Sequence, residues 1–256
     1  MQNNRLIAAS RAFGIHLALS VLVALLAAYV VLQLWFPFPY RILAGGQHLF
    51  WLMVGIDVVC GPLLTAVIFN PAKSRRELTL DLSLIALIQV AALAYGLYSI
   101  AQARPVVLAF ETDRMVAVSA AQIERQSLHQ APAQFQALSW TGPALLGTRA
   151  PNDGAEMLKG IELSMQGISP GVRPGWWQDY EESRPLAKQR MKKLADLQAT
   201  LAVQAQAVLD KAVRESGLPL SQLFYVPMTS QKVLEGWVVL LDSNASIVGY
   251  AAVDGF

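Results

Sequence analysis

The first hundred residues alternate between long apolar stretches and short polar segments. Three stretches are almost free of charge: Phe13–Phe36, Leu49–Phe69 and Leu80–Ile100. A helix needs roughly 20 mainly apolar residues to cross the hydrocarbon core of a bilayer. Each stretch meets that length, so the pattern predicts three transmembrane helices, numbered here as spans one to three.

Beyond residue 104 the apolar runs become short and alternate with turn residues. The runs "PVVLAF" and "RMVAVSA" are separated by "ETD", which is typical of a β-hairpin. Near the other end, "LFYVPM", "GWVVLLD" and "SIVGYAAVD" predict three strands, the last two joined by a turn over Asp242–Ser246. We therefore expect an antiparallel sheet in this part of the chain.

Helical patterns lie between these two groups of strands. Residues 119–127 predict a short helix. The segment 139–178 is rich in Gly and Pro and contains a second predicted short helix over residues 153–165. From Leu194 to Ala212 apolar residues recur at three- and four-residue steps, which predicts one long amphipathic helix that Gly217 and Pro219 end. The expected architecture is a three-transmembrane-helix bundle, residues 1–104, followed by a small α+β domain, residues 105–256.

The basic residues predict how the chain is oriented in the membrane. Arg5 and Arg11 precede span one, and residues 73–76 between spans two and three contain three more, whereas the loop between spans one and two has only Arg41. Basic segments stay on the cytoplasmic side. We expect a cytoplasmic N-terminus, a first span that is retained as an anchor, and a periplasmic domain from residue 105 onward.

Composition narrows the function classes further. The chain is 54% hydrophobic and 15% charged, with a net charge of +2, and no stripe of Lys and Arg interleaves with aromatic residues as in nucleic-acid-binding proteins. It has one cysteine, Cys60, and three widely spaced histidines, so no disulfide within the chain and no metal-ligand spacing is expected. Hydrolase, nucleotide-binding and metalloprotease motifs are missing, and we expect neither an enzyme nor a cofactor.

Asp57 is the only charged residue of span two, and no Lys, Arg or His lies within eight residues of it. An aspartate at the centre of a membrane helix costs about 2.5–3.5 kcal/mol on insertion scales. Helical spacing places Asp57, Gly61 and Thr65 on one stripe, and Pro62 frees the carbonyl of Val58 from its helical hydrogen bond. The stripe is therefore expected to face protein.

Span three has a matching stripe, on which Asp81, Gln89 and Gly96 fall. Two interpretations stay open. The polar residues hold the bundle together as hydrogen-bonded contacts between helices, or they line a groove for an incoming helix. Catalysis by an aspartate pair is disfavoured, because Asp81 lies toward the opposite face of the bilayer from Asp57. Trp176 and Trp177 are expected in the core or at an interface, with an exposed contact site as the alternative.

The region 45–118 resembles the type IV pilin accessory proteins, also described as the pilin-specific chaperone family (the TfpX/TfpZ type). The resemblance depends on a set of residues taken together: Gly45, Gly46, Asp57, Gly61, Pro62, Thr65, Lys73, Asp81, Gln89, Tyr95, Gly96, Arg104, Pro105, Phe110, Asp113 and Arg114. Met115 departs from the pattern, since an aromatic residue is expected there.

The resemblance implies an inner-membrane protein that binds and stabilises one major pilin before pilus assembly, with other assembly components as further partners. Such a pilin has an apolar anchor helix, which contains a glutamate, and a periplasmic head. We hypothesise that Asp57, Gly61, Thr65, Gln89 and Gly96 line a groove for that helix and that the periplasmic domain contacts the head. Pro62, Asp81, Arg104 and Pro105 are expected to be structural.

A membrane-anchored periplasmic sensor, or a ligand-binding protein that signals through a partner, is the alternative. The predicted cytoplasmic parts are only about a dozen residues at the N-terminus and a short loop, so a sensor would need a partner to produce its output. A membrane enzyme is the third reading, and the lack of a nucleophile with a matching base disfavours it.

Overall fold

The computed structural model describes residues 2–43 and 46–256. By their internal contacts these residues form two compact units. The helical unit contains the residues up to Pro37 and those from 46 to Ala103, and the sheet unit contains residues 38–43 and Arg104–Phe256. Residues 38–43 were expected in the membrane domain, whereas the structure packs them into the sheet unit.

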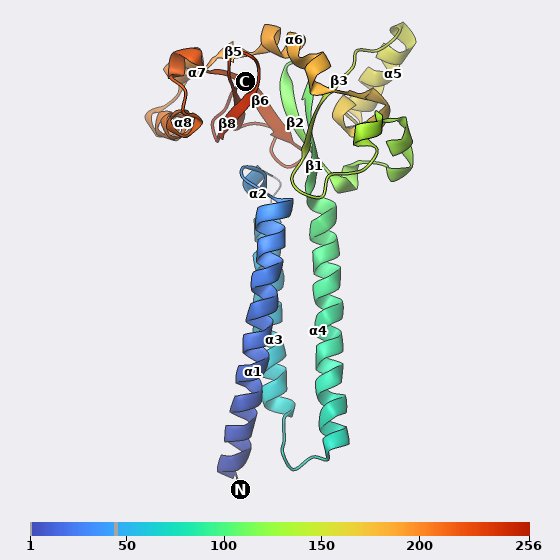
Figure 1. Ribbon diagram of the computed structural model, residues 1–256, viewed down its shortest axis with the longest axis vertical. Coiled ribbons are helices and arrows are strands. Elements are labelled where there is room, and N and C mark those ends of the chain that lie inside the picture. The colour runs from blue at the N-terminus through green and yellow to red at the C-terminus, as the bar shows by residue number, and fades with distance from the viewer. Residues whose placement is uncertain (1, 44–45) are drawn as a thin grey trace. The chain divides into compact units, whose positions relative to one another are not determined.

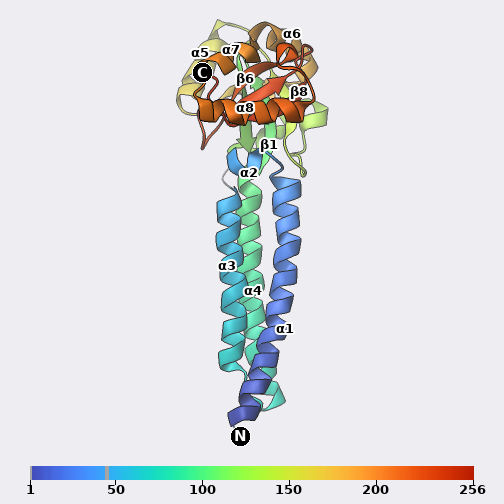
Figure 2. The same cartoon turned by 90° about the vertical axis from the view of Figure 1, so that its left-hand side faces the viewer.

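Three long helices make up the helical unit, and they run side by side (Figures 1 and 2). They are α1, Gln2–Tyr29, which continues as the π-helical turn Val30–Trp35; α3, Gly46–Ile68; and α4, Arg75–Ala103. All three are long and apolar enough to cross a membrane, over Arg5–Trp35, Phe50–Ile68 and Arg75–Ala103. The apolar pattern therefore located these helices, although the first and third are longer than expected.

The described strands of the sheet unit form one mixed sheet in the order β4-β3-β1-β2-β6-β7-β8, with β5 beside β6. Their bounds are β1 Pro105–Glu111, β2 Arg114–Ser119, β3 Ala144–Thr148, β4 Trp177–Gln178, β5 Lys192–Lys193, β6 Phe224–Ser230, β7 Val238–Leu241 and β8 Ile247–Ala251. The expected hairpin is present, with Glu111 opposite Arg114, as are the three C-terminal strands.

The expectation of an antiparallel sheet was wrong at two places. Strand β3 pairs with β1 in parallel, and β6 pairs with β2 in parallel. Parallel neighbours need long crossover connections, and here more than a hundred residues separate β2 from β6. Hairpin signals report only neighbours in sequence, so these two pairings were not visible in the pattern.

The helices of the sheet unit are α2 Tyr40–Leu43, α5 Gly154–Met165, α6 Tyr180–Arg190, α7 Leu194–Thr200 and α8 Val203–Ser216. Short 3-10 turns cover Ala120–Gln122, Arg125–Gln130, Ala133–Phe135, Pro170–Val172, Pro174–Trp176 and Leu220–Gln222. The expected single long helix is two helices, because the backbone is extended at Leu201 and Ala202. The left-handed Gly217 ends α8 as expected.

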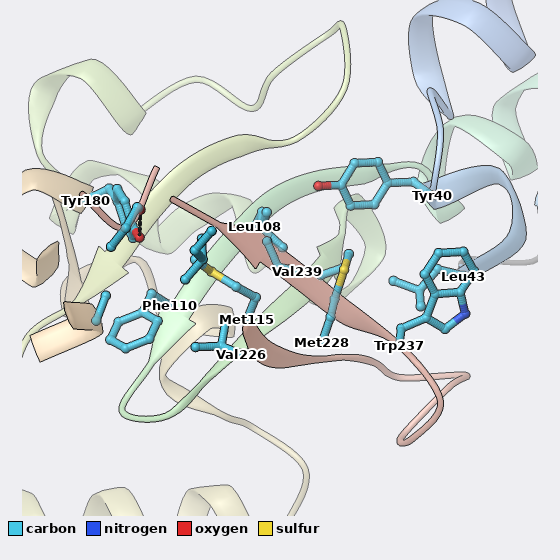
Figure 3. Close-up of a cluster of buried hydrophobic side chains, with 14 residues drawn as sticks. Tyr40, Leu43, Leu108, Phe110, Met115, Tyr180, Val226, Met228, Trp237 and Val239 are labelled. Carbon is cyan, nitrogen blue, oxygen red and sulfur yellow. Dashed lines mark hydrogen bonds between the residues drawn. The ribbon is translucent and has the colours of Figure 1, made fainter. Parts of the chain in front are cut away.

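Both faces of the sheet are buried. Leu108 and Phe110 of β1 point to one face, where they join Met115, Val226 and Met228 in the cluster that Figure 3 shows. The alternate residues of β1 join Trp177 on the other face, and α7 and α8 cover the strands β6 to β8 there. Trp177 is a core residue whose Nε1 donates to the carbonyl of Gly171 at 2.8 Å, as the core interpretation expected.

Candidate functional site

Glycine residues bring the helices of the helical unit into close contact. Helix α3 packs against both α1 and α4. A Cβ atom at Gly61 would collide with the side-chain amide of Gln89, and one at Gly96 would collide with the thioether of Met53. Both glycines therefore permit a close approach between α3 and α4, which larger residues would prevent.

A crevice of about 190 Å³ lies among the three helices. Its polar lining comes from all of them: His16 and Ser20 on α1, Asp57 on α3 and Gln89 on α4. The apolar lining residues are Leu19, Val23, Ala24, Val54, Ala86, Val90 and Leu93. The structure thus brings Asp57 and Gln89 together, as the two stripes suggested, and faces them toward the interior of the bundle.

The crevice opens between α1 and α4. Two of its lining residues, Leu19 on α1 and Val90 on α4, are 57% and 63% exposed, respectively. Since α3 packs against both of these helices, the open side must lie between the faces of α1 and α4 that carry these residues. A side chain of another membrane helix could enter there and meet polar groups in apolar surroundings.

Gln89 is anchored within the crevice. Its Nε2 donates to the main-chain oxygen of Asp57 at 3.2 Å. This bond lies beside Pro62, which has no amide hydrogen to give to the carbonyl of Val58. The hydrogen bond between Gln89 of α4 and the main chain of α3 therefore lies next to the point where Pro62 interrupts the main-chain hydrogen bonding of α3. The Asp57 side chain lines the crevice.

Thr65 has a different environment from the one expected. It is 2% exposed, and its hydroxyl lies 2.6 Å from Nδ1 of His16 on α1. Thr65 therefore helps hold α1 against α3 and does not line the crevice. His16 lines the crevice and binds Thr65, although the wide spacing of the histidines in the sequence gave no sign of a site. The available signal was its position within the first span, where an ionisable residue is expensive.

The remaining sequence-predicted residues lie outside the crevice. Gly96 contacts Met53, and the Asp81 carboxylate pairs with Lys73 at 2.6 Å, close to the end of α3. Arg104 is buried in the sheet unit, and its carbonyl accepts from the Ala120 amide at 3.0 Å; Pro105 begins β1. Of the Gly45-Gly46 pair in the resemblance, Gly46 begins α3 and Gly45 is outside the described residues.

No group of three or more His, Cys, Asp or Glu residues in the described part of the chain could hold a metal ion. The chemistry that the crevice offers is hydrogen bonding. It contains a carboxylate, an imidazole, an amide and a hydroxyl, contributed by four residues on three helices. In apolar surroundings such groups strongly favour a partner that can satisfy them.

Comparison with known proteins gives a consistent group of relatives. The family model described as "Fimbrial assembly protein FimB" matches residues 4–45. The "Fimbrial assembly protein, serogroup I" of Dichelobacter nodosus is 36% identical over 256 residues, which is all of this chain and 99% of the relative. The serogroup E1 protein of the same organism gives the same identity and coverage.

A shorter relative adds to this group. The "Fimbrial assembly protein, serogroups C1 and C2" of Dichelobacter nodosus is 44% identical over 131 residues, which covers 51% of this chain and 100% of the relative. No solved structure gives a significant match to the chain.

Proposed function

Because the chain belongs to the fimbrial assembly protein family and so has a role in fimbrial biogenesis, we propose that it is a membrane-held chaperone for a major pilin. In this proposal it binds the pilin and stabilises it until assembly into the fimbria. The helical unit grips the anchor helix of the pilin, and the sheet unit contacts the pilin head.

The crevice is the observation on which this proposal depends. Its polar groups lie between helices that are otherwise apolar, and it opens between α1 and α4. Lipid chains cannot hydrogen-bond to Asp57 or His16, whereas a polar side chain on an incoming helix can. At about 190 Å³ the crevice is too small for a whole helix, so we infer that the helix lies along α1 and α4 and inserts one or two side chains.

The proposed location is the bacterial inner membrane. The basic residues before the first span and between the second and third favour a cytoplasmic N-terminus. The sheet unit then lies in the periplasm, on the side where a pilin anchored by its N-terminal helix exposes its head. The role is binding and not catalysis, in keeping with the assembly role that the relatives' names describe.

Substitution of Asp57 by Asn tests the crevice. Asn keeps the size of the side chain and removes the carboxylate, and a hydrogen bond to a charged group contributes about 1.5–3 kcal/mol. Co-purification of the pilin with the full-length protein should therefore fall roughly tenfold or more. Unchanged co-purification, with helix content preserved by circular dichroism, would remove Asp57 from the binding site.

Site-specific photo-crosslinking tests the location independently. A crosslinker at Val90, which lines the open crevice, should capture the co-expressed pilin. The matched control is Leu87, which lies on the same helix, is 66% exposed and does not line the crevice. Equal capture from both positions would indicate nonspecific contact in the membrane and would contradict the proposed groove.

A further inference from the structure

A second, larger pocket lies wholly within the sheet unit. Its volume is about 960 Å³, and its walls come from α5, from the 3-10 turn Arg125–Gln130 and from the segment Val172–Trp176. Neither the apolar pattern nor any sequence motif indicated it, because its walls come from three separate parts of the chain. Its size suits a peptide of several residues or another molecule of similar size.

The pocket is shaped by two glycines. A Cβ atom at Gly160 on α5 would lie 3.1 Å from the Trp176 ring, and one at Gly175 would lie 2.9 Å from Oε1 of Gln130. Both distances are shorter than an ordinary van der Waals contact. The walls are therefore packed together closely at these two points.

Trp176 is held in place by arginine residues. The guanidinium carbons of Arg173 and Arg149 lie 4.1 Å and 4.9 Å from its ring centroid, respectively. Arg149 also donates to both carboxylate oxygens of Glu156, at 2.6 Å and 3.0 Å. These hydrogen bonds lower the pKa of Glu156 to about 2, so the Arg149–Glu156 pair stays ionised and fixes this wall.

Charges of both signs remain available in the pocket. Glu124 and Lys159 line it and are exposed, and neither side chain has an ion pair or hydrogen bond among the residues that the structure describes. Gln122 and Gln130 add amide groups, and Leu163 and Ile168 add apolar surface. The pocket thus combines an acid, a base, amides and an apolar wall.

We propose that this pocket binds an extended polypeptide segment on the head of the pilin, which names the contact that the proposed function leaves open and rests on that function. A peptide presents main-chain amides, apolar side chains and charges of both signs, which match this lining. A polyanion would meet the unpaired Glu124. A saccharide would need a free aromatic face, whereas two guanidinium groups already lie over Trp176.

Helix α5 also has an exposed apolar face on the side away from the pocket. Leu158, Ile161 and Met165 lie on one face of α5 and are exposed, although they belong to a well-formed helix. Exposed apolar residues that gather on one surface are typical of protein interaction sites, and methionine adapts readily to different partner shapes. Because Ala155, Lys159 and Leu163 line the pocket from the other side of α5, this face would be a second, separate contact with a partner.

A pair of matched variants tests the proposal in the full-length protein. Ala155→Trp places a large side chain in the pocket from an exposed position on α5, while Ala207→Trp makes the same change on the exposed face of α8. Two probes are used, the whole pilin and the pilin head without its anchor helix. Binding of the head should fall at least tenfold in Ala155→Trp and stay unchanged in Ala207→Trp.

A charge reversal gives a second variant that does not fill the pocket. Lys159→Glu should weaken binding of the head by up to about fivefold, the range of one exposed ion pair, and added salt should reduce the difference. If the head binds equally to wild type, Ala155→Trp and Lys159→Glu, the pocket is not its binding site. This holds even if whole pilin is still captured through Asp57. A second result would also overturn the peptide site. If only Ala155→Trp weakens binding of the head, and the wild type binds N-acetylglucosamine oligomers in the same pocket, the pocket is a saccharide site.

The same experiment can refute the proposed function independently of the pocket. If wild type captures neither whole pilin nor its head, the chaperone role is wrong and this inference falls with it. If whole pilin is captured in an Asp57-dependent way and the head alone never binds, only the pocket is wrong.

Discussion

Leu43 ends the short helix α2 between the candidate spans α1 and α3, yet it is 0% exposed in the core of the sheet unit. Figure 3 shows it beside Trp237 and Met228, with Tyr40 nearby. Its main-chain oxygen accepts from the hydroxyl of Ser230 at 3.1 Å. Leu43→Ala would leave that hydrogen bond in place and remove only the packing of the side chain.

The size of the effect follows from this geometry. Leucine-to-alanine substitutions at buried positions cost about 2.7–5.0 kcal/mol. The segment around Leu43 is short and can relax toward the cavity, so we expect about 3 kcal/mol, near the lower end of that range. This corresponds to a change of roughly a hundredfold in the equilibrium for opening the sheet.

Hydrogen exchange of the full-length protein in detergent measures this change. Amides of β7, which lie in the same cluster, should exchange roughly a hundredfold faster in Leu43→Ala if they open with the sheet. The neighbouring Ile42 is 54% exposed, so Ile42→Ala should change the stability by no more than about 0.5 kcal/mol. Similar exchange rates in both variants would refute the packing of this loop into the sheet unit.

Two further predictions concern the sheet unit. Burial raises the pKa of Glu111, whose carboxylate accepts from the Ser169 hydroxyl and the Gly171 amide, each at 2.6 Å. The folded state therefore binds more protons than the unfolded state between the ordinary glutamate pKa, about 4.3, and the raised value, and stability should fall as the pH rises through that window. Glu111→Gln keeps an acceptor oxygen and should flatten this dependence in urea unfolding; an unchanged slope would contradict it. Gly217 has φ +70° at the end of α8, so Gly217→Ala should cost about 1 kcal/mol in thermal unfolding, whereas Gly154→Ala, at an unstrained position, should cost nothing. Equal effects of the two changes would contradict the strain argument.

The helical unit was predicted well because the length of an apolar run alone is enough to indicate a membrane helix. A run of about 20 apolar residues has few structures open to it other than a membrane helix. The same reasoning correctly turned Asp57 and Gln89 toward the interior of the bundle. It did not reveal that Thr65 is bonded to His16, because helical periodicity gives the face of a residue and not the neighbouring helix that this face meets.

The sheet unit was predicted less completely, for a related reason. Local signals located the hairpin at Glu111–Arg114 and the turn at Asp242–Ser246, where the partners are close in sequence. The parallel pairing of β2 with β6 depends on packing between distant segments, and the break between α7 and α8 interrupts an apolar pattern that continues across it. The insertion of Tyr40 and Leu43 into the core had no local signal, because the sequence around them is typical of an ordinary interfacial loop.

The incomplete packing of the helical unit bears on whether its polar residues only join the three helices or also form a groove for another helix. Only 11% to 17% of each candidate span is buried by the rest of the chain. If Asp57, His16 and Gln89 served only to join the three helices, their hydrogen-bonding groups would be used up within the bundle. The Gln89 amide and the Thr65 hydroxyl are used in that way. The Asp57 carboxylate interacts with Gln89 and His16, and it also lines a crevice that opens between exposed residues of α1 and α4. A carboxylate that reaches such an opening is costly in lipid and favourable beside a polar group of another helix, so the same residue that weakens the isolated bundle would strengthen a complex with another membrane helix.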